Sequence, residues 1–295
     1  AEPLLRPNVL FIVCDDLNTH VAPSGYRSIQ TPALDDLAAN SMTFRRAYCQ
    51  YPVCGPSRAS FLSGLYPETT GVLNNTADIR KSRPDSVSMP EQFKANGYWT
   101  ASVGKIFHST RHQQGEVAWH EQIMFQNDEL PLVTRVRQTY EARNGSVDLR
   151  ANRKKWKAHL QKLSTQTRGQ TPPGYGPTGL RDEQHKDGKN VRQIISWLDQ
   201  KKYGEKPFFI ACGIQKPHVP FLAPQEYFDQ YPLKDLKFPL SPANDWEDIP
   251  ALAMVKRFQS FGFEMGREND SLRREYTQAY HACISYIDAQ LGMLF

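Results

Sequence analysis

The sequence predicts an α/β fold with a central, mostly parallel sheet flanked by helices. Three apolar runs of strand length, residues 8–14, 98–103 and 207–214, carry this prediction. Unbroken runs of this kind are typical of strands buried on both faces. Helical segments separate the runs, and a strand, helix, strand order favours parallel strands joined by crossovers. With 295 residues and 39% hydrophobic content, the chain can bury a sizeable core.

Helices are expected between the strands, with recognisable ends. The segments 31–40 and 88–97 each open with Thr or Ser followed closely by proline, the pattern of an N-cap and a first helical turn. Glycine closes the second segment and follows a third over 191–203. A further helix is predicted over 56–64. The region 109–190 is charged and rich in turn residues near its end, so we interpret it as a loop-rich insertion.

Ionisable side chains follow all three predicted strands. Asp15 and Asp16 follow the first, Lys105 and His108 the second, and His218 the third. Ligands of open α/β sheets bind beyond the carboxyl ends of the strands. Taken singly, the aspartates could cap a turn, the lysine could be a surface charge and each histidine could be structural. The agreement of three strand ends favours one shared site.

The stretch YPVCGPSRASFLSGLYP, residues 51–67, places a cysteine at the start of a predicted helix. An anion bound there would meet backbone N–H groups and the positive end of the helix dipole. Arg58 follows Cys54 by four residues, so a helix returns it to the same face. This arrangement suits chemistry on a tetrahedral anion.

Net charge, apolar run length and cysteine spacing indicate which kinds of partner and disulfide content to expect. The net charge is +5, and the basic excess is concentrated in residues 149–170. A solvated helix face explains that stretch better than a polyanion site, so no nucleic-acid partner is expected. No apolar run approaches the ~20 residues that cross a bilayer, so no membrane span is expected. The five cysteines lack the spacing of a disulfide framework, and mostly buried free thiols are expected.

The segment beginning at Cys54 resembles the signature of the sulfatases of the alkaline phosphatase-like superfamily, C-x-P-S-R followed by x-x-x-L-T-G-R. Within that family the sequence is most similar to the iduronate-2-sulfatase branch. Ser63 and Leu65 depart from the signature, standing where the family has Thr and Arg. The resemblance covers positions 9 to 292 through these blocks: VLFIVCDDL, VCGPSRASFLSG, MPEQFKANGYWTASVGKIFH, PFFIACGIQKPHVPF and AYHACISYIDAQLG.

The resemblance implies a modified nucleophile and a metal. A formylglycine-generating or equivalent enzyme would oxidise Cys54 to formylglycine. One hydroxyl of the aldehyde hydrate would attack sulfur, and the second would then expel sulfate. Asp15, Asp16 and the residue formed from Cys54 would bind one divalent cation, implied to be Ca²⁺.

The resemblance also implies catalytic roles for four other side chains. Arg58 would pair with the formylglycine oxygen and the metal-site carboxylates, and Lys105 would stabilise charge on the sulfate oxygens. His108 would handle the proton of the hydrate. His218 would contact the sulfate or protonate the leaving alcohol.

The function implied is that of an exported sulfatase with an alkaline phosphatase-like sandwich. Its substrate would be a sulfated carbohydrate, such as a sulfated uronate during polysaccharide degradation. The start at Ala1 is typical of a mature end left by signal-peptide removal, which indicates a periplasmic, extracellular or, in a eukaryote, lysosomal protein. The alternatives are a phosphodiester or phosphonate hydrolase of the same superfamily and a non-catalytic sulfated-glycan binder.

The end of the sequence carries a further expectation. Residues 271–294 have apolar side chains at helical spacing, with neither glycine nor proline after the last of them. The family's later S-D-H-G-type block, which completes the metal site, is absent from the sequence. Residues 1–295 are therefore expected to be the N-terminal portion of the catalytic domain, with a C-terminal remainder as its partner.

Overall fold

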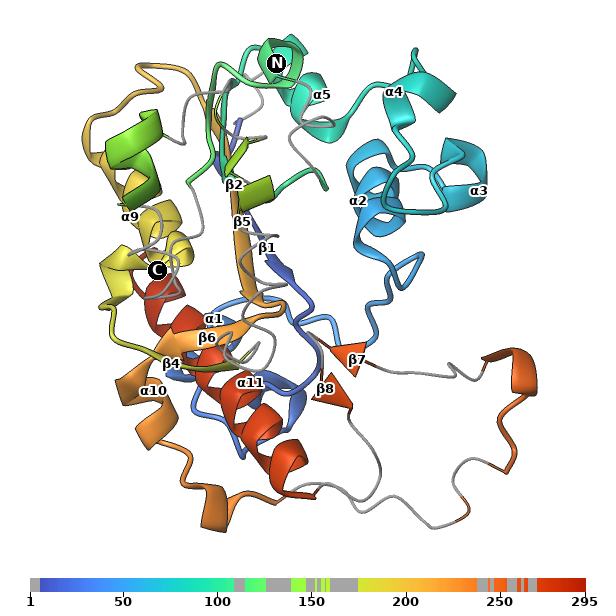
Figure 1. Cartoon of the computed structure of the whole chain (residues 1–295). Helices are drawn as coiled ribbons and strands as arrows, with labels where there is room; N and C mark the ends of the chain where they lie inside the picture. Colours follow the sequence, from blue (N-terminus) through green and yellow to red (C-terminus); the bar gives the residue numbers. More distant parts are fainter. Residues whose placement is uncertain are drawn as a thin grey trace. The chain divides into compact units, whose positions relative to one another are not determined.

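In the computed structural model the chain forms two compact units. Figure 1 draws its helices and strands. The first unit comprises Ala1–Asn127, Glu183–Lys216 and Ile287–Phe295, and the second comprises Asp128–Asp182 and Pro217–Tyr286. The structure describes the following residues: 6–108, 115–125, 139–146, 152, 155–156, 158–159, 175–237, 244, 247–253, 259–260, 263–264 and 270–295.

A four-stranded sheet forms the centre of the first unit. Its order is β1 (Val9–Asp15), β5 (Phe208–Pro217), β2 (Trp99–Gly104) and β3 (Glu121–Ile123) (Figure 1). β2 pairs in parallel with both β5 and β3. The three predicted strands and the parallel α/β sheet are confirmed. The sequence did not predict β3, which lies inside the stretch 109–190 and is only three residues long.

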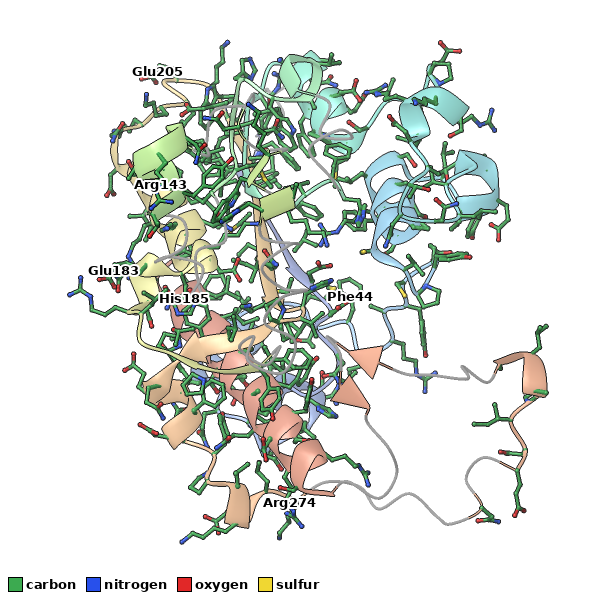
Figure 2. All side chains as sticks on the ribbon, viewed as in Figure 1. Phe44, Arg143, Glu183, His185, Glu205 and Arg274 are labelled. Carbon is green, nitrogen blue, oxygen red and sulfur yellow. The ribbon has the colours of Figure 1, made fainter. Side chains whose placement is uncertain are left out.

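The predicted helices are also present. They are α1 (Pro32–Ala39), α2 (Cys54–Ser63), α5 (Met89–Ala95) and α9 (Lys186–Asp199). α5 starts in a capping box, in which the Glu91 carboxylate accepts the N–H of Ser88 at 2.7 Å. α2 starts two residues before the expected position and α9 five residues before it. Figure 2 labels the buried His185, the N-cap residue of α9. The short helices of this unit are α3 (Pro67–Thr70), α4 (Ile79–Ser82) and α6 (Gly115–Ala118).

Helices cover opposite faces of the sheet. Trp99 of β2 packs edge-on against Trp197 of α9, with ring centroids 5.9 Å apart. Phe209 of β5 is in register with Thr100, and side chains alternate between faces along a strand, so Phe209 points the other way. There it stacks on Phe93 of α5 at 4.4 Å. The sheet is therefore the middle layer between helices. The candidate site lies at the carboxyl ends of its strands.

A hydrophobic cluster holds α2 and α5 to the face of the sheet that carries Phe209. Burial of these side chains is the main stabilising contribution in this part of the chain. The buried members are Leu62, Tyr98, Ile106, Phe107, Ala118, Trp119, Phe209 and Ala211.

The second unit contains a small parallel sheet of β4 (Tyr175–Thr178) and β6 (Phe221–Pro224). Residues from the first part of α11 (Asp270–Leu291) pack on it. Tyr276 stacks obliquely on Tyr175 at 4.4 Å, and Phe221 contacts the edge of Tyr276 at 5.9 Å. Five members of the apolar stripe predicted for the last helix are buried: Tyr276, Cys283, Ile284, Ile287 and Leu291. The other elements are α10 (Gln225–Asp229), β7 (Gln259–Ser260) and β8 (Phe263–Glu264).

Other expectations are met in part or fall on residues that are not described. Within the described residues, no helix is both long and apolar enough to cross a bilayer. Cys212 and Cys283 are buried free thiols, Cys14 and Cys54 are half-buried, and Cys49 is exposed. Most of the basic stretch 149–170, and much of the stretch 109–190, lie outside the described residues.

Candidate active site

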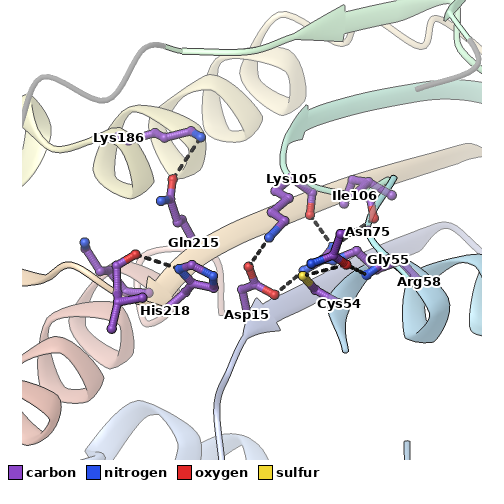
Figure 3. Close-up of polar contacts among 12 residues, drawn as sticks. Asp15, Cys54, Gly55, Arg58, Asn75, Lys105, Ile106, Lys186, Gln215 and His218 are labelled. Carbon is purple, nitrogen blue, oxygen red and sulfur yellow. Dashed lines mark hydrogen bonds and ion pairs between the residues drawn. The ribbon is translucent and has the colours of Figure 1, made fainter. Parts of the chain in front are cut away.

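The site is centred on the carboxylate of Asp15, the last residue of β1. Its Oδ1 accepts a hydrogen bond from Arg58 at 3.0 Å, and its Oδ2 pairs with the ammonium of Lys105 (Figure 3). Asp15 is 4% exposed. Burial raises the pKa of this carboxyl, but Arg58 and Lys105 outweigh burial and hold the pKa below its usual range. Asp15 is therefore an anion at neutral pH.

Arg58 binds backbone as well as carboxylate. Its second terminal nitrogen donates to the carbonyls of Lys105 at 2.5 Å and Ile106 at 2.8 Å. The side chain is almost completely buried. Buried arginine is stable only when its donors are satisfied, and these three acceptors satisfy much of the fork. Arg58 thus links α2 to the end of β1 and to the segment after β2.

Two facing glycines bring Lys105 into position. Gly104 of β2 and Gly213 of β5 are in register, and the N–H of Lys105 donates to the Gly213 carbonyl at 3.2 Å. A Cβ on Gly104 would lie 2.1 Å from the Gly213 oxygen, and a Cβ on Gly213 would lie 2.3 Å from the Lys105 backbone. Gly104 also has φ +76°, a conformation that favours glycine. The approach therefore depends on both residues lacking side chains.

Cys54 is the first residue of α2 and is half-buried. Its Sγ lies 3.5 Å from Oδ1 of Asn75, and the same oxygen accepts the N–H of Gly55 at 2.8 Å (Figure 3). The helix that carries Cys54 also carries Arg58. The thiol and the arginine that pairs with Asp15 therefore belong to the same helix.

His108 follows β2 and lines a small cavity next to the first turn of α2. The cavity has a volume of about 20 Å³, enough for about one water molecule. The residues that line it are Gly55, Arg58, Ala59, Val72, Ala77, Ile79, Phe107 and His108.

The predicted site residues are thus brought together in part. Asp15, Arg58 and Lys105 are in direct contact. Asp16 is exposed, with φ +61°, because the chain turns there after β1. His218 belongs to the second unit, where its Nδ1 lies 2.6 Å from the Val219 carbonyl oxygen.

Comparison with known proteins gives the family. The sulfatase family model matches residues 7–295. A sulfatase of Formosa agariphila is 33% identical over 97% of this chain and 54% of its own length. The human iduronate 2-sulfatase is 31% identical over 97% of this chain and 50% of its own length. The chain belongs to the sulfatase family.

The fold of this sulfatase-family chain is also that of a solved relative. The phosphonate monoester hydrolase of Silicibacter pomeroyi superimposes with a TM-score of 0.69 at 20% identity, covering 98% of this chain and 58% of that one. The match confirms the alkaline phosphatase-like fold class. The chain spans about half the length of the relatives it matches.

The donor set of this sulfatase-family chain fits a hard cation as part of a coordination shell. Carboxylate oxygens are the ligands that Ca²⁺ prefers, and Asp15 and Asp16 supply two carboxylates in succession. Each Asp15 oxygen accepts from one cation, and a carboxylate offers about four lone-pair sites, so acceptor capacity remains. Among the described residues, no group of three or more His, Cys, Asp or Glu side chains could hold a metal.

Sequence reasoning did not find two polar side chains that organise the site. Asn75 contacts Cys54 and Gly55 from 21 and 20 residues away, respectively. Asp187 of α9 is buried and accepts the backbone N–H groups of Gln215 and Lys216, each at 2.8 Å, which fixes the end of β5. Asn75 lies in a turn and Asp187 in the first turn of α9, positions where Asn and Asp commonly cap local backbone. That ordinary role gives no signal of a long-range contact.

Proposed function

We propose that this chain is part of a sulfatase that hydrolyses a sulfate ester through a formylglycine formed from Cys54. The observation that carries the proposal is the placement of Cys54 at the start of α2, the helix whose Arg58 is buried against Asp15. Family membership supports the reaction class. The formylglycine would supply the nucleophile that attacks sulfur.

In this proposal, Asp15 and Asp16 would hold a divalent cation, which would supply Lewis-acid polarisation of the sulfate. Arg58 holds the Asp15 carboxylate and the first turn of α2 in fixed positions. Lys105 stabilises charge on the sulfate oxygens, because its ammonium lies at the carboxylate of the site.

We assign proton transfer to the two histidines. His108 handles the proton of the modified Cys54, and its place on the cavity next to α2 supports this role. His218 donates a proton to the leaving alcohol or contacts the sulfate. A neutral imidazole accepts a proton and an imidazolium donates one near neutral pH, which suits both tasks.

We propose a sulfated carbohydrate as substrate, with a sulfated uronate in a polysaccharide as the specific candidate. The similarity to iduronate 2-sulfatase supports this class. We further propose export of the protein, a modifying enzyme as a transient partner, and a C-terminal remainder of the polypeptide that completes the site.

The test is to express the full-length protein together with a formylglycine-generating enzyme. The intact mass of the peptide containing Cys54 should be lower than that of the cysteine form, and the protein should release sulfate from an aryl sulfate. Cys54→Ala should abolish release while the thermal unfolding temperature changes little, because the side chain is only half-buried. Turnover by Cys54→Ala near the parent rate would contradict the mechanism.

The same assay separates the alternatives. A phosphonate or phosphodiester hydrolase would turn over an aryl phosphonate faster than the matched aryl sulfate. A non-catalytic glycan binder would turn over neither substrate, even with Cys54 fully converted.

A further inference from the structure

The Asn75 side chain contacts both the candidate nucleophile and the peptide that follows it. Its Oδ1 accepts the N–H of Gly55 at 2.8 Å and lies 3.5 Å from the Sγ of Cys54 (Figure 3). Backbone N–H groups at the start of a helix lack partners within the helix. The N-cap residue of α2, Val53, makes no side-chain hydrogen bond to these groups. Asn75, from a separate loop, instead accepts the N–H of Gly55.

Close packing fixes this contact as well as the hydrogen bond. A Cβ on Gly55 would lie 2.7 Å from the Asn75 oxygen, 3.1 Å from the Asn75 Cα and 3.2 Å from the Asn74 carbonyl oxygen. The first contact is below 3.0 Å, so the Asn75 side chain would have to shift, and the other two are tight contacts with backbone atoms. The glycine at position 55 therefore allows the loop to reach Cys54.

The loop is held independently of that contact. Oδ1 of Asn74 accepts from the Thr76 N–H at 2.9 Å, the Thr76 hydroxyl at 2.7 Å and the Ala77 N–H at 2.9 Å. Asn side chains commonly bind backbone two residues on and so fix a turn. The turn presents Asn75 to α2 with little freedom, which a positioning role requires.

We propose that Asn75 is a positioning residue for the proposed reaction: it fixes the orientation of residue 54 by binding the adjacent peptide N–H. The inference rests on the proposed function. A side chain at the start of a helix can rotate between staggered conformers, and a nucleophile in the wrong one does not face the substrate. The hydrogen bond from the Gly55 N–H to Asn75 fixes the peptide next to residue 54 and so restricts the conformers of that side chain. Misplacement of a reacting group by about 1 Å can cost about 10²-fold in rate.

The experiment compares Asn75→Ala and Asn75→Asp in the full-length protein made with the modifying enzyme. Asn75→Ala removes the acceptor, so kcat on an aryl sulfate should fall about 10-fold to 100-fold, while KM changes little. Asn75→Asp keeps an acceptor of the same size and should restore much of kcat. Its carboxylate repels an anionic ester, so its KM should rise. The mass of the Cys54 peptide establishes that conversion is equal in all variants.

Hydrogen exchange gives a readout that does not depend on activity. Exchange of the Gly55 amide should accelerate in Asn75→Ala and stay slow in Asn75→Asp. Gly55→Ala keeps every polar group but pushes the loop away, so it should resemble Asn75→Ala in kcat. Asn40→Ala, at the exposed residue that follows α1, is the matched control and should behave like the parent.

The outcomes separate this inference from the proposed function. No sulfate release by the converted parent protein would overturn the proposed function, and fast Gly55 exchange in that parent would overturn the contact. An active parent with unchanged kcat in Asn75→Ala, or equal losses in Asn75→Ala and Asn75→Asp, would overturn the positioning role. If Asn75→Ala does not fold, Asn75→Asp and Gly55→Ala provide the same contrast.

Discussion

At the scale of single residues, one buried carboxylate organises the site. Asp15 receives Arg58 on one oxygen and Lys105 on the other, and both Asp15 and Arg58 are nearly inaccessible to solvent. Removing one member of such a set leaves an unpaired buried charge, which is far costlier than losing an exposed ion pair. The exposed Arg27 and Asp35 pair, at 3.0 Å, is the comparison within the same unit.

The lowered pKa of Asp15 predicts a pH-dependent contribution to stability. Because the folded pKa lies below the unfolded value, the contribution is complete above the unfolded value of about 3.9 and is lost as pH falls through the folded pKa. The measurement is urea unfolding of the parent and of Asp15→Asn, with a chelator present, at a series of pH values. The difference in unfolding free energy should be constant from neutral pH to about 4.5 and shrink below that.

A matched variant removes the exposed Asp35 instead. Asp35→Asn should change the unfolding free energy by less than about 1 kcal/mol at every pH. A difference between parent and Asp15→Asn that grows on acidification would contradict the ion-pair assignment.

At the scale of elements, a side chain from the end of α11 caps the start of α1. The carboxylate of Asp288 accepts the N–H groups of Ala33 at 3.0 Å and Leu34 at 2.9 Å. Thr31, the N-cap residue of α1 by sequence, makes no side-chain cap bond. Its hydroxyl instead accepts the N–H of Ala22 at 3.0 Å.

This cap can be tested by substitution. Asp288→Ala should lower the free energy of unfolding by about 0.5–2 kcal/mol, the usual cost of losing an N-cap acceptor. Asp288→Asn keeps an acceptor and should lose less. Thermal and urea unfolding of the three proteins measure the effect, and equal stability of parent and Asp288→Ala would show that the contact contributes nothing.

The sequence predicts elements well where the signal is local. The apolar runs and the caps placed β1, β2, β5 and the main helices to within a few residues. β3 escaped because a three-residue edge strand has too little pattern to detect. The caps that Asp288 and Asn75 form were not predicted, because their partners are 254 and 20 residues away. Residue spacing along a chain does not indicate such long-range contacts.

The site was predictable to a different degree. The sequence named Asp15 and Lys105 through their positions after strands and Arg58 through its spacing from Cys54, and the structure puts Asp15 in contact with both. The sequence did not show that Arg58 also donates hydrogen bonds to two backbone carbonyls. That detail depends on how the backbone after β2 passes α2, which two glycines at the sheet edge determine.

At the scale of the whole molecule, metal binding should stabilise the folded state. A ligand that binds only the folded protein adds about 2.7 kcal/mol at 100 times its dissociation constant. Saturating Ca²⁺ should therefore raise the unfolding temperature of the full-length protein, and a chelator should lower it to the metal-free value. Asp16→Asn, which leaves the Asp15 ion pairs intact, should reduce the Ca²⁺-dependent rise because one anionic ligand is lost.

A turn-capping role for Asp16 gives a different result. In that case Asp16→Asn would lower the unfolding temperature equally with and without Ca²⁺, and calorimetric titration would show unchanged metal affinity. Asp36→Asn, at a surface position in α1, is the control for a general effect of removing charge.

The ion pairs of Asp15 also bear on how long the folded state lasts. They join residues 43 and 90 positions apart, and closing long loops costs chain entropy before any contact forms. Charged groups at the edge of a sheet gain their pairing energy only once strands and helix have docked, so we expect this network to form late in folding. Contacts absent from the folding transition state govern unfolding rates. We therefore expect substitutions that weaken these ion pairs to raise the unfolding rate and shorten the lifetime of the native protein, while the folding rate stays nearly unchanged.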